Sequence, residues 1–190
     1  MKKQIKVTLI VIVAAIIAAA IIWYVMYLRG KEQDLLTPVG TRAEFIGDTD
    51  KYPTMLTAKG TQILNADGEQ VVLKGVMVPE SRSLYEEKKF NEDFYKDVFA
   101  KGGNAIRVPI SPVEYKNDDY YMWRYLDRIV TWAGENDNYV ILDWDYTGNP
   151  IDGSGDEMPD LDENPLDYSA EFWKNIADYF KNTPNVIFEI

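Results

Sequence analysis

The sequence predicts an α/β domain built on a parallel sheet, and three observations support this. Short apolar runs alternate along the chain with longer segments whose apolar residues recur at helical spacing. The short runs are almost continuously apolar, as expected for parallel strands covered by helices. One of them opens the stretch Tyr139–Pro150, in which four apolar strand residues run directly into clustered carboxylates and aromatic rings. An apolar strand that ends in such residues is typical of the edge at which a parallel sheet carries its functional site.

Four segments are predicted as the strands of this sheet. In chain order they are Lys74–Pro79, Asn104–Ile110, Tyr139–Asp145 and Asn185–Ile190. Strands that alternate with helices form βαβ units with right-handed crossovers, which leaves two architectures open, a doubly wound sheet and a (β/α)8 barrel. No glycine-rich loop follows any of the four strands, so the pattern disfavours nucleotide binding.

Three segments between the strands are predicted as helices, because each keeps its apolar residues on one helical face. They are Phe90–Lys101, Tyr120–Asn136 and Ala170–Lys181. A β-hairpin is predicted ahead of the first strand of the sheet. Its arms are Thr61–Asn65 and Gln70–Lys74, and the Asp-Gly pair between them is a strong tight-turn signal.

The N-terminal segment predicts a membrane anchor. Val7–Leu28 is 22 residues without a charge, long enough to cross the hydrocarbon core of a bilayer. Three lysines precede it and aromatic residues gather at its end, so the N-terminus is expected to face the cytoplasm. A cleavable signal peptide is the alternative, because Ala18-Ala19-Ala20 offers a cleavage site. The run continues past these alanines, which favours an uncleaved anchor.

The chain is therefore expected to have three parts. Residues 1–29 form the signal anchor or transmembrane helix, residues 30–55 a stalk, and residues 56–190 the α/β domain. Either interpretation of the N-terminus places the domain outside the cytoplasm. It is membrane-anchored if the segment stays attached and secreted if the segment is cut.

The composition narrows the chemistry. The net charge is −11 and no acidic residue precedes Glu32, so the domain is expected to repel nucleic acid. Cysteine and histidine are absent, which excludes disulfides, the commonest zinc ligands and serine–histidine mechanisms. Acid–base chemistry would fall to carboxylates, tyrosine or lysine. The five Trp and thirteen Tyr suit sugar-stacking surfaces as well as a packed core.

Six motifs in order carry a resemblance to a known family. They are the hairpin Gly60–Lys74, Lys74-Gly-Val-Met-Val-Pro, Asn104-Ala-Ile-Arg-Val-Pro, Val140-Ile-Leu-Asp-Trp, Phe172-Trp-Lys-Asn-Ile-Ala and Asn185-Val-Ile-Phe-Glu-Ile. In this order and spacing, residues 56–190 resemble the N-terminal half of glycoside hydrolase family five, of the endoglucanase and mannanase type. The resemblance implies the first four strands of a (β/α)8 barrel and activity on β-linked glucan or mannan, without a cofactor.

The resemblance also implies a retaining mechanism with two glutamates about 5 Å apart. The family's acid/base glutamate lies in an Asn-Glu-Pro after the fourth strand, and its nucleophile lies on the seventh. The sequence stops at Ile190, before both, and the match puts Glu189 inside the strand. We therefore expect a fragment of a longer gene product that contains no catalytic residue and is inactive alone.

Substrate contacts are expected at Arg107, Trp144, Asp145 and Tyr146. Arg107 matches a family arginine beside the nucleophile, where a fixed cation keeps a carboxylate ionised; an ion pair in the lower barrel is the alternative. Asp145 stands where the family usually has histidine, and an ionised aspartate can only accept hydrogen bonds. This change predicts either a damaged or a retuned site. Trp144 and Tyr146 either face the sugar or pack at the rim.

No metal site is expected, because the acidic loop 152–167 lacks the spacing of an EF-hand. A function from a different class is a catalytically inactive, membrane-anchored barrel that binds polysaccharide, which Asp145 and the missing glutamates support. Four strands leave two open edges, so the domain alone is expected to self-associate rather than to form a stable monomer.

Overall fold

The computed structural model describes residues 13, 15–28, 51–149, 151–152, 154 and 164–190. The chain divides into two units, Met1–Thr37 and Pro38–Ile190. In the first unit, residues 15–28 are helical and exposed. Over the described part of the chain, no helix is both long and apolar enough to span a membrane. Residues 7–12 and 14 of the predicted anchor and residues 30–50 of the predicted stalk lie outside the described residues, so both stay predictions.

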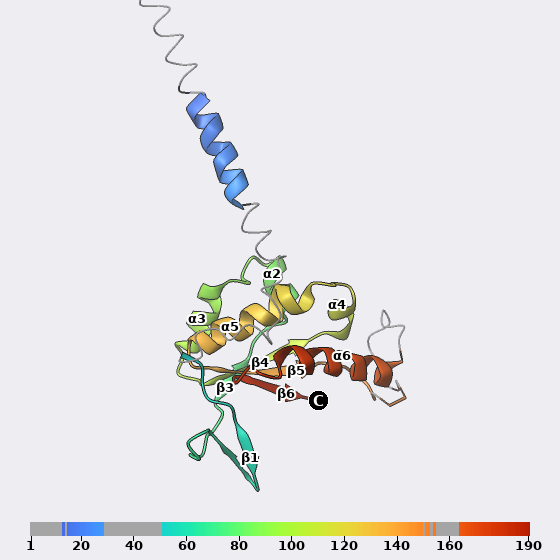
Figure 1. The fold of residues 1–190 in the computed structure, drawn as a ribbon. Coiled ribbons are helices and arrows are strands. Elements are labelled where there is room, and N and C mark those ends of the chain that lie inside the picture. Colours follow the sequence, from blue (N-terminus) through green and yellow to red (C-terminus); the bar gives the residue numbers. More distant parts are fainter. Residues whose placement is uncertain (1–12, 14, 29–50, 150, 153, 155–163) are drawn as a thin grey trace, which may run out of the picture. The chain divides into compact units, whose positions relative to one another are not determined.

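The second unit holds a four-stranded parallel sheet in the order β3-β4-β5-β6 (Figure 1). The strands are β3 (Gly75–Met77), β4 (Ala105–Ile110), β5 (Tyr139–Trp144) and β6 (Val186–Glu189), which confirms the four predicted strands. Each strand pairs in parallel with the next one in the chain. A strand order that simply follows the chain is the arrangement of a (β/α)8 barrel, whereas a doubly wound sheet reverses its order at a switch point.

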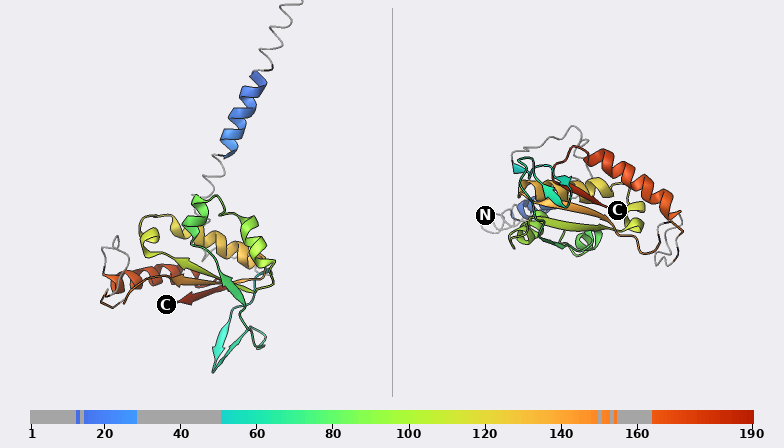
Figure 2. Two further views of the ribbon diagram at one scale, coloured as in Figure 1. Left: turned by 180° about the vertical axis from the view of Figure 1, so that it is seen from behind. Right: turned by 90° about the horizontal axis from the view of Figure 1, so that it is seen from below.

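Helices connect the strands and flank the sheet (Figures 1 and 2). Between β3 and β4 lie α2 (Ser81–Glu86) and α3 (Glu92–Phe99); between β4 and β5 lie α4 (Pro112–Lys116), the π-helix η2 (Met122–Leu126) and α5 (Asp127–Glu135); between β5 and β6 lies α6 (Pro165–Phe180). The three predicted helices are confirmed as α3, η2 with α5, and α6. The sequence does not predict α2 and α4, because such short segments show no helical period.

The first turns of the longer helices differ from the prediction. The segment predicted as one helix from Tyr120 starts as the π-helical turn η2 before it continues as α5. The last helix begins at Pro165 rather than Ala170. Its N-cap is Asn164, whose side-chain oxygen accepts from the backbone N–H groups of Leu166 at 3.0 Å and Asp167 at 3.2 Å. Proline suits the first helical position because its missing N–H would be unpaired there anyway.

The predicted hairpin forms, and a turn that the sequence does not predict precedes it. The predicted arms meet across Asp67-Gly68 at the antiparallel bridge Leu64↔Gln70 and at a 2.8 Å hydrogen bond from the Val71 N–H to the Ile63 carbonyl. Ahead of them, strand β1 (Thr57–Lys59) pairs antiparallel with β2 (Gln62–Leu64), so the unpredicted turn is Gly60-Thr61. Gly60 has a φ of 60°, and glycine at this first turn position gives a two-residue turn that matches strand twist.

The core lies between the sheet and its helices. Buried side chains there include Ile106, Val108, Ile110, Val140, Leu142, Tyr95, Tyr125, Leu126, Ile129, Val130, Phe172, Ile176 and Phe180. Side chains alternate along a strand, so the intervening residues of β4 and β5 face the other side of the sheet. On that side Met77 is 61% exposed, whereas Ala105 and Asp143 are buried. The helices thus pack on one face of the sheet, and we call the other face, which carries Met77 and Arg107, the open face.

Residues 51–54 fasten the start of the domain to the end of the sheet where the strands begin. The hydroxyl of Tyr139, the first residue of β5, donates to the carbonyl of Thr54 at 2.7 Å. The Tyr52 ring lies against Gly134 near the end of α5, where a β-carbon would collide with the ring. The chain therefore enters the domain at the amino ends of the strands.

Candidate active site at the carboxyl ends of the strands

Three charged side chains meet on the open face of the sheet. Arg107 is in the middle of β4, while Asp143 and Glu189 lie towards the carboxyl ends of β5 and β6. The register pairs Asp143 with Glu189 directly. Paired residues of parallel strands point to the same side, so the two carboxylates stand next to each other and the long arginine reaches both.

The Arg107 guanidinium is held from several directions. Its Nε lies 2.8 Å from Glu189 Oε2 and its Nη2 lies 3.2 Å from Glu189 Oε1, a two-pronged hydrogen bond. Nη2 is also 2.9 Å from Asp143 Oδ2, an ion pair by distance without hydrogen-bond geometry. Nη1 contacts Met77 Sδ at 3.0 Å. The planar fork of arginine suits such a grip because it presents its N–H groups in fixed directions.

The two carboxylates have opposite electrostatic environments. Hydrogen bonds from Arg107 lower the pKa of Glu189, whose side chain is 44% exposed. Burial raises the pKa of Asp143, whose side chain is 8% exposed, and the positive charge of Arg107 opposes this rise. The charges of Glu189 and Asp145 raise the Asp143 pKa further. Burial penalises the ionised form of a carboxyl, and nearby negative charge adds to that penalty.

Asp145 and Tyr146 follow β5 at the same end of the sheet. Asp145 is exposed, and its backbone N–H donates to the carbonyl of Ile110 at 3.1 Å, which continues the pairing of β5 with β4. Its charge also raises the pKa of Arg107, behind the larger effect of the hydrogen bond to Glu189. Tyr146 is half-buried. The structure thus brings Asp145 to the edge of the charged group around Arg107.

Trp144 lies on the opposite side of the sheet from Arg107. Its ring stacks on Phe172 of α6 with centroids 4.0 Å apart, and it meets the rings of Tyr168 and Tyr115 edge-on. Strand alternation explains this position, because Trp144 is one residue from Asp143 and therefore points the other way. The structure places Trp144 among the aromatic side chains of the helix layer, while its predicted contact with substrate stays a prediction.

The predicted set of substrate-binding residues omits Asp143 and Glu189, the two partners of Arg107. A signal for Asp143 is present in the sequence, because it stands two residues before Asp145 and so on the same side of an extended strand. Glu189 is inside β6, as predicted. Over the described residues, no group of three or more histidine, cysteine or acidic residues is arranged to hold a metal ion.

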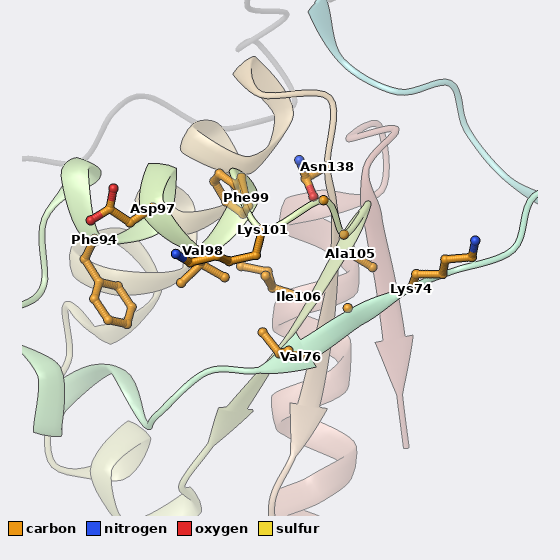
Figure 3. Close-up of a pocket in the computed structure, with 13 residues that line it drawn as sticks. Lys74, Val76, Phe94, Asp97, Val98, Phe99, Lys101, Ala105, Ile106 and Asn138 are labelled. Carbon is orange, nitrogen blue, oxygen red and sulfur yellow. The ribbon is translucent and has the colours of Figure 1, made fainter.

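An apolar groove with a volume of about 580 Å³ lies elsewhere on the domain, between β3 and α3 (Figure 3). Val76, Val98 and Ile106 converge in it, and Phe94 and Phe99 contribute from α3. Neither Arg107 nor its carboxylate partners line it. The groove borders the unpaired edge of β3, so we treat it as a feature of the open sheet and not as part of the candidate active site.

A sequence-family model for cellulase, glycosyl hydrolase family 5, matches residues 64–190. The chain belongs to this family. It is 28% identical over 156 residues to endoglucanase A of Butyrivibrio fibrisolvens, a match that covers 74% of this chain and 32% of that protein. The family 5 chain thus spans about a third of the length of this curated relative.

Solved structures support the same fold. A β-glucanase from Saccharophagus degradans matches with a TM-score of 0.66 at 23% identity, over 74% of this chain and 43% of that one; it has also been solved with cellotetraose. A β-mannanase from Thermomonospora fusca matches with a TM-score of 0.50 at 18% identity, over 72% and 41%. These likenesses show that the family 5 chain has the fold of part of a family 5 barrel.

Proposed function

We propose that this family 5 chain contributes the first four strands of a barrel that hydrolyses β-linked glucan or mannan with retention of configuration. The observation that carries the proposal is the fixed guanidinium of Arg107 on the open face of the sheet, 2.8 Å from Glu189 and 2.9 Å from Asp143. A preorganised cation at this place can orient a nucleophilic carboxylate and keep it ionised.

In this proposal, Glu189 is not a catalytic glutamate. Both of its oxygens accept hydrogen bonds from Arg107, and it lies inside β6. A retaining enzyme needs one glutamate free to exchange a proton and a second one free to attack the sugar. We assign both to positions outside these 190 residues, so that the described strands supply binding and positioning groups.

Asp145 and Tyr146 are the proposed sugar contacts at the end of β5. Asp145 is exposed and can accept hydrogen bonds from sugar hydroxyls, although it cannot donate one as the family's usual histidine can. Tyr146 lies beside it and is half-buried; its hydroxyl oxygen is inaccessible to solvent, so the proposed contact with a sugar is made by the ring. The packing of Trp144 against Phe172 supports a different task, that of holding the end of β5 in place for its neighbours.

The proposed location is outside the cytoplasm, where polysaccharide is found. The uncharged run Val7–Leu28 supports attachment to a membrane through the N-terminal segment. If that segment is cleaved, the protein is secreted. Membrane fractionation of the producing cells, followed by mass determination of the mature N-terminus, distinguishes the two cases.

The proposed function is tested with the whole protein that contains these residues, assayed for reducing ends on carboxymethyl-cellulose and on mannan. We expect turnover on at least one polymer and a loss of about 100-fold or more in kcat/KM for Arg107→Ala, because a preorganised charge is removed. Arg82→Ala is the matched control, since Arg82 forms ion pairs at the surface with Glu86 and Glu114. If neither polymer is hydrolysed, or if both variants lose kcat/KM equally, the proposal is contradicted.

A second function is a polysaccharide-binding barrel without catalysis. The observation that favours it is Asp145 in the place of a hydrogen-bond donor, beside two further carboxylates. Under this alternative the whole protein binds insoluble cellulose or mannan in a pull-down and releases no reducing ends. Binding together with turnover would exclude it.

A further inference from the structure

We propose that Asp143 is a positioning residue of this site: a buried carboxylate that, together with Glu189, fixes the Arg107 guanidinium and sets the net charge around it. The inference rests on the proposed function, because it concerns the arginine to which that function assigns a role. It assigns different roles to Asp143 and Glu189, which the sequence alone does not distinguish.

Each nitrogen of the Arg107 guanidinium has a partner. Nε and Nη2 bond Glu189, Nη2 approaches Asp143, and Nη1 contacts Met77. These partners lie on three different strands: β3 and β5, which flank β4, and β6, which lies beyond β5. A guanidinium held in this way has little rotational freedom left, so its orientation is decided by the sheet and not by the substrate.

The two carboxylates that hold Arg107 differ in burial. The Glu189 side chain is 44% exposed and the Asp143 side chain is 8% exposed. Solvent screens the charge of an exposed group, whereas a buried charge acts through a medium of lower dielectric constant. Of the two charges, that of Asp143 therefore raises the Arg107 pKa more, although the hydrogen bond to Glu189 has the largest single effect.

One carboxylate oxygen of Asp143 is buried without a hydrogen bond. Asp143 Oδ2 is inaccessible to solvent and accepts no hydrogen bond, although the Arg107 charge lies 2.9 Å away. A buried carboxylate oxygen without a hydrogen bond is costly to keep, and such groups concentrate at functional sites. A purely structural ion pair in this domain, Asp118 with Arg124 at 2.7 Å, is hydrogen-bonded.

The sign of the effect follows from charge. With both carboxylates ionised, Arg107 and its two partners carry a net charge of −1, and Asp143→Asn makes it zero. A nearby catalytic carboxylate then loses a negative neighbour, so its pKa falls. The acidic limb of a kcat/KM profile reports the group that must be ionised in the free enzyme. That limb should therefore move to lower pH.

The test compares pH profiles of the whole protein with those of Asp143→Asn and Asp118→Asn. We expect the acidic limb of Asp143→Asn to move down by about half a pH unit or more and its kcat to fall by about 10-fold, because the arginine is less well oriented. Asp118→Asn removes a charge from another buried pair of the domain, outside the Arg107 group. It should lower the melting temperature and leave the profile in place.

Each outcome decides the matter. A profile of Asp143→Asn that coincides with that of the unchanged protein overturns the inference and leaves the proposed function intact. If Asp143→Asn does not fold, Asp143→Ser decides in its place: a shift of the acidic limb to lower pH supports the inference, and no shift overturns it. Absence of turnover in the unchanged protein overturns the proposed function and this inference with it.

Discussion

At the scale of single residues, the character of the site depends on how many negative charges surround Arg107. Asp143 and Glu189 already exceed the charge of the guanidinium by one negative charge, and Asp145 adds a third carboxylate at the end of β5. Its charge contributes to the raised pKa of Asp143. An imidazole at that position would bring a hydrogen-bond donor and remove a negative charge. Residue 145 is therefore the position at which we test whether the site is damaged or retuned.

We predict that Asp145→His raises kcat/KM of the whole protein on its preferred polymer by about 10-fold, which corresponds to one restored hydrogen bond of about 1.4 kcal/mol. Initial rates of reducing-end release measure this. Asp97→His, an exposed change on α3, controls for the mere addition of histidine. If the unchanged protein and Asp145→His are both inactive, the site is damaged for other reasons and not merely retuned.

At the scale of elements, α6 carries the aromatic layer that holds the end of β5. Phe172 of α6 stacks on Trp144, and Trp173 meets Phe188 of β6 edge-on at 5.7 Å. The helix starts at the Asn164 cap, just after residues 155–163, which lie outside the described residues. The position of the two strand ends therefore depends on how well the first turn of α6 is formed.

We predict that Asn164→Ala lowers the free energy of unfolding by about 1 kcal/mol, because two N–H groups of the first helical turn lose their acceptor. Lys174→Ala, an exposed change in the middle of the same helix, should change stability by less than about 0.5 kcal/mol. Urea unfolding of the whole protein measures both. Equal effects of the two substitutions would show that the cap contributes nothing special.

The sequence predicts the parallel strands and the long helices well, because their apolar periods are set by burial against each other. It fails at elements whose signals are short or local. The Asp67-Gly68 turn is predicted, but the turn at Gly60 ahead of it is missed, since strands as short as β1 show no alternation. The sequence leaves open whether Trp144 faces the sugar or packs at the rim. The strand register places it on the helix side of the sheet, against Phe172. Arg107 is predicted, yet its partner Asp143 becomes recognisable as such only when two strands are placed side by side.

At the scale of the whole molecule, the described sheet has two unpaired edges, β3 and β6. Val76 and Met77 on β3 are 58% and 61% exposed, and the apolar groove beside them continues this surface onto α3. Unpaired strands with exposed apolar side chains are templates for association with other strands. We therefore expect further strands, from the same protein or from another copy, to pair with these edges.

We predict that residues 51–190 produced alone form dimers or larger species in sedimentation at micromolar concentration. Val76→Lys should shift the distribution towards monomer, because a charge on an edge strand opposes pairing. Lys59→Ala, on the hairpin strand β1, is a control outside the sheet. A sharp two-state melt of a monomer would contradict this prediction.

The packing of the Tyr52 ring against Gly134 has a practical consequence for immobilising the protein. Because Tyr139 and Thr54 tie the start of the domain to the ends where the strands begin, a tag or a solid support joined directly to residue 51 is attached at that end. Asp145 lies at the other end, where β5 finishes. A bead or chip joined at residue 51 should consequently leave the carboxyl ends of the strands, where we propose that sugar binds, accessible to a polymer as bulky as cellulose.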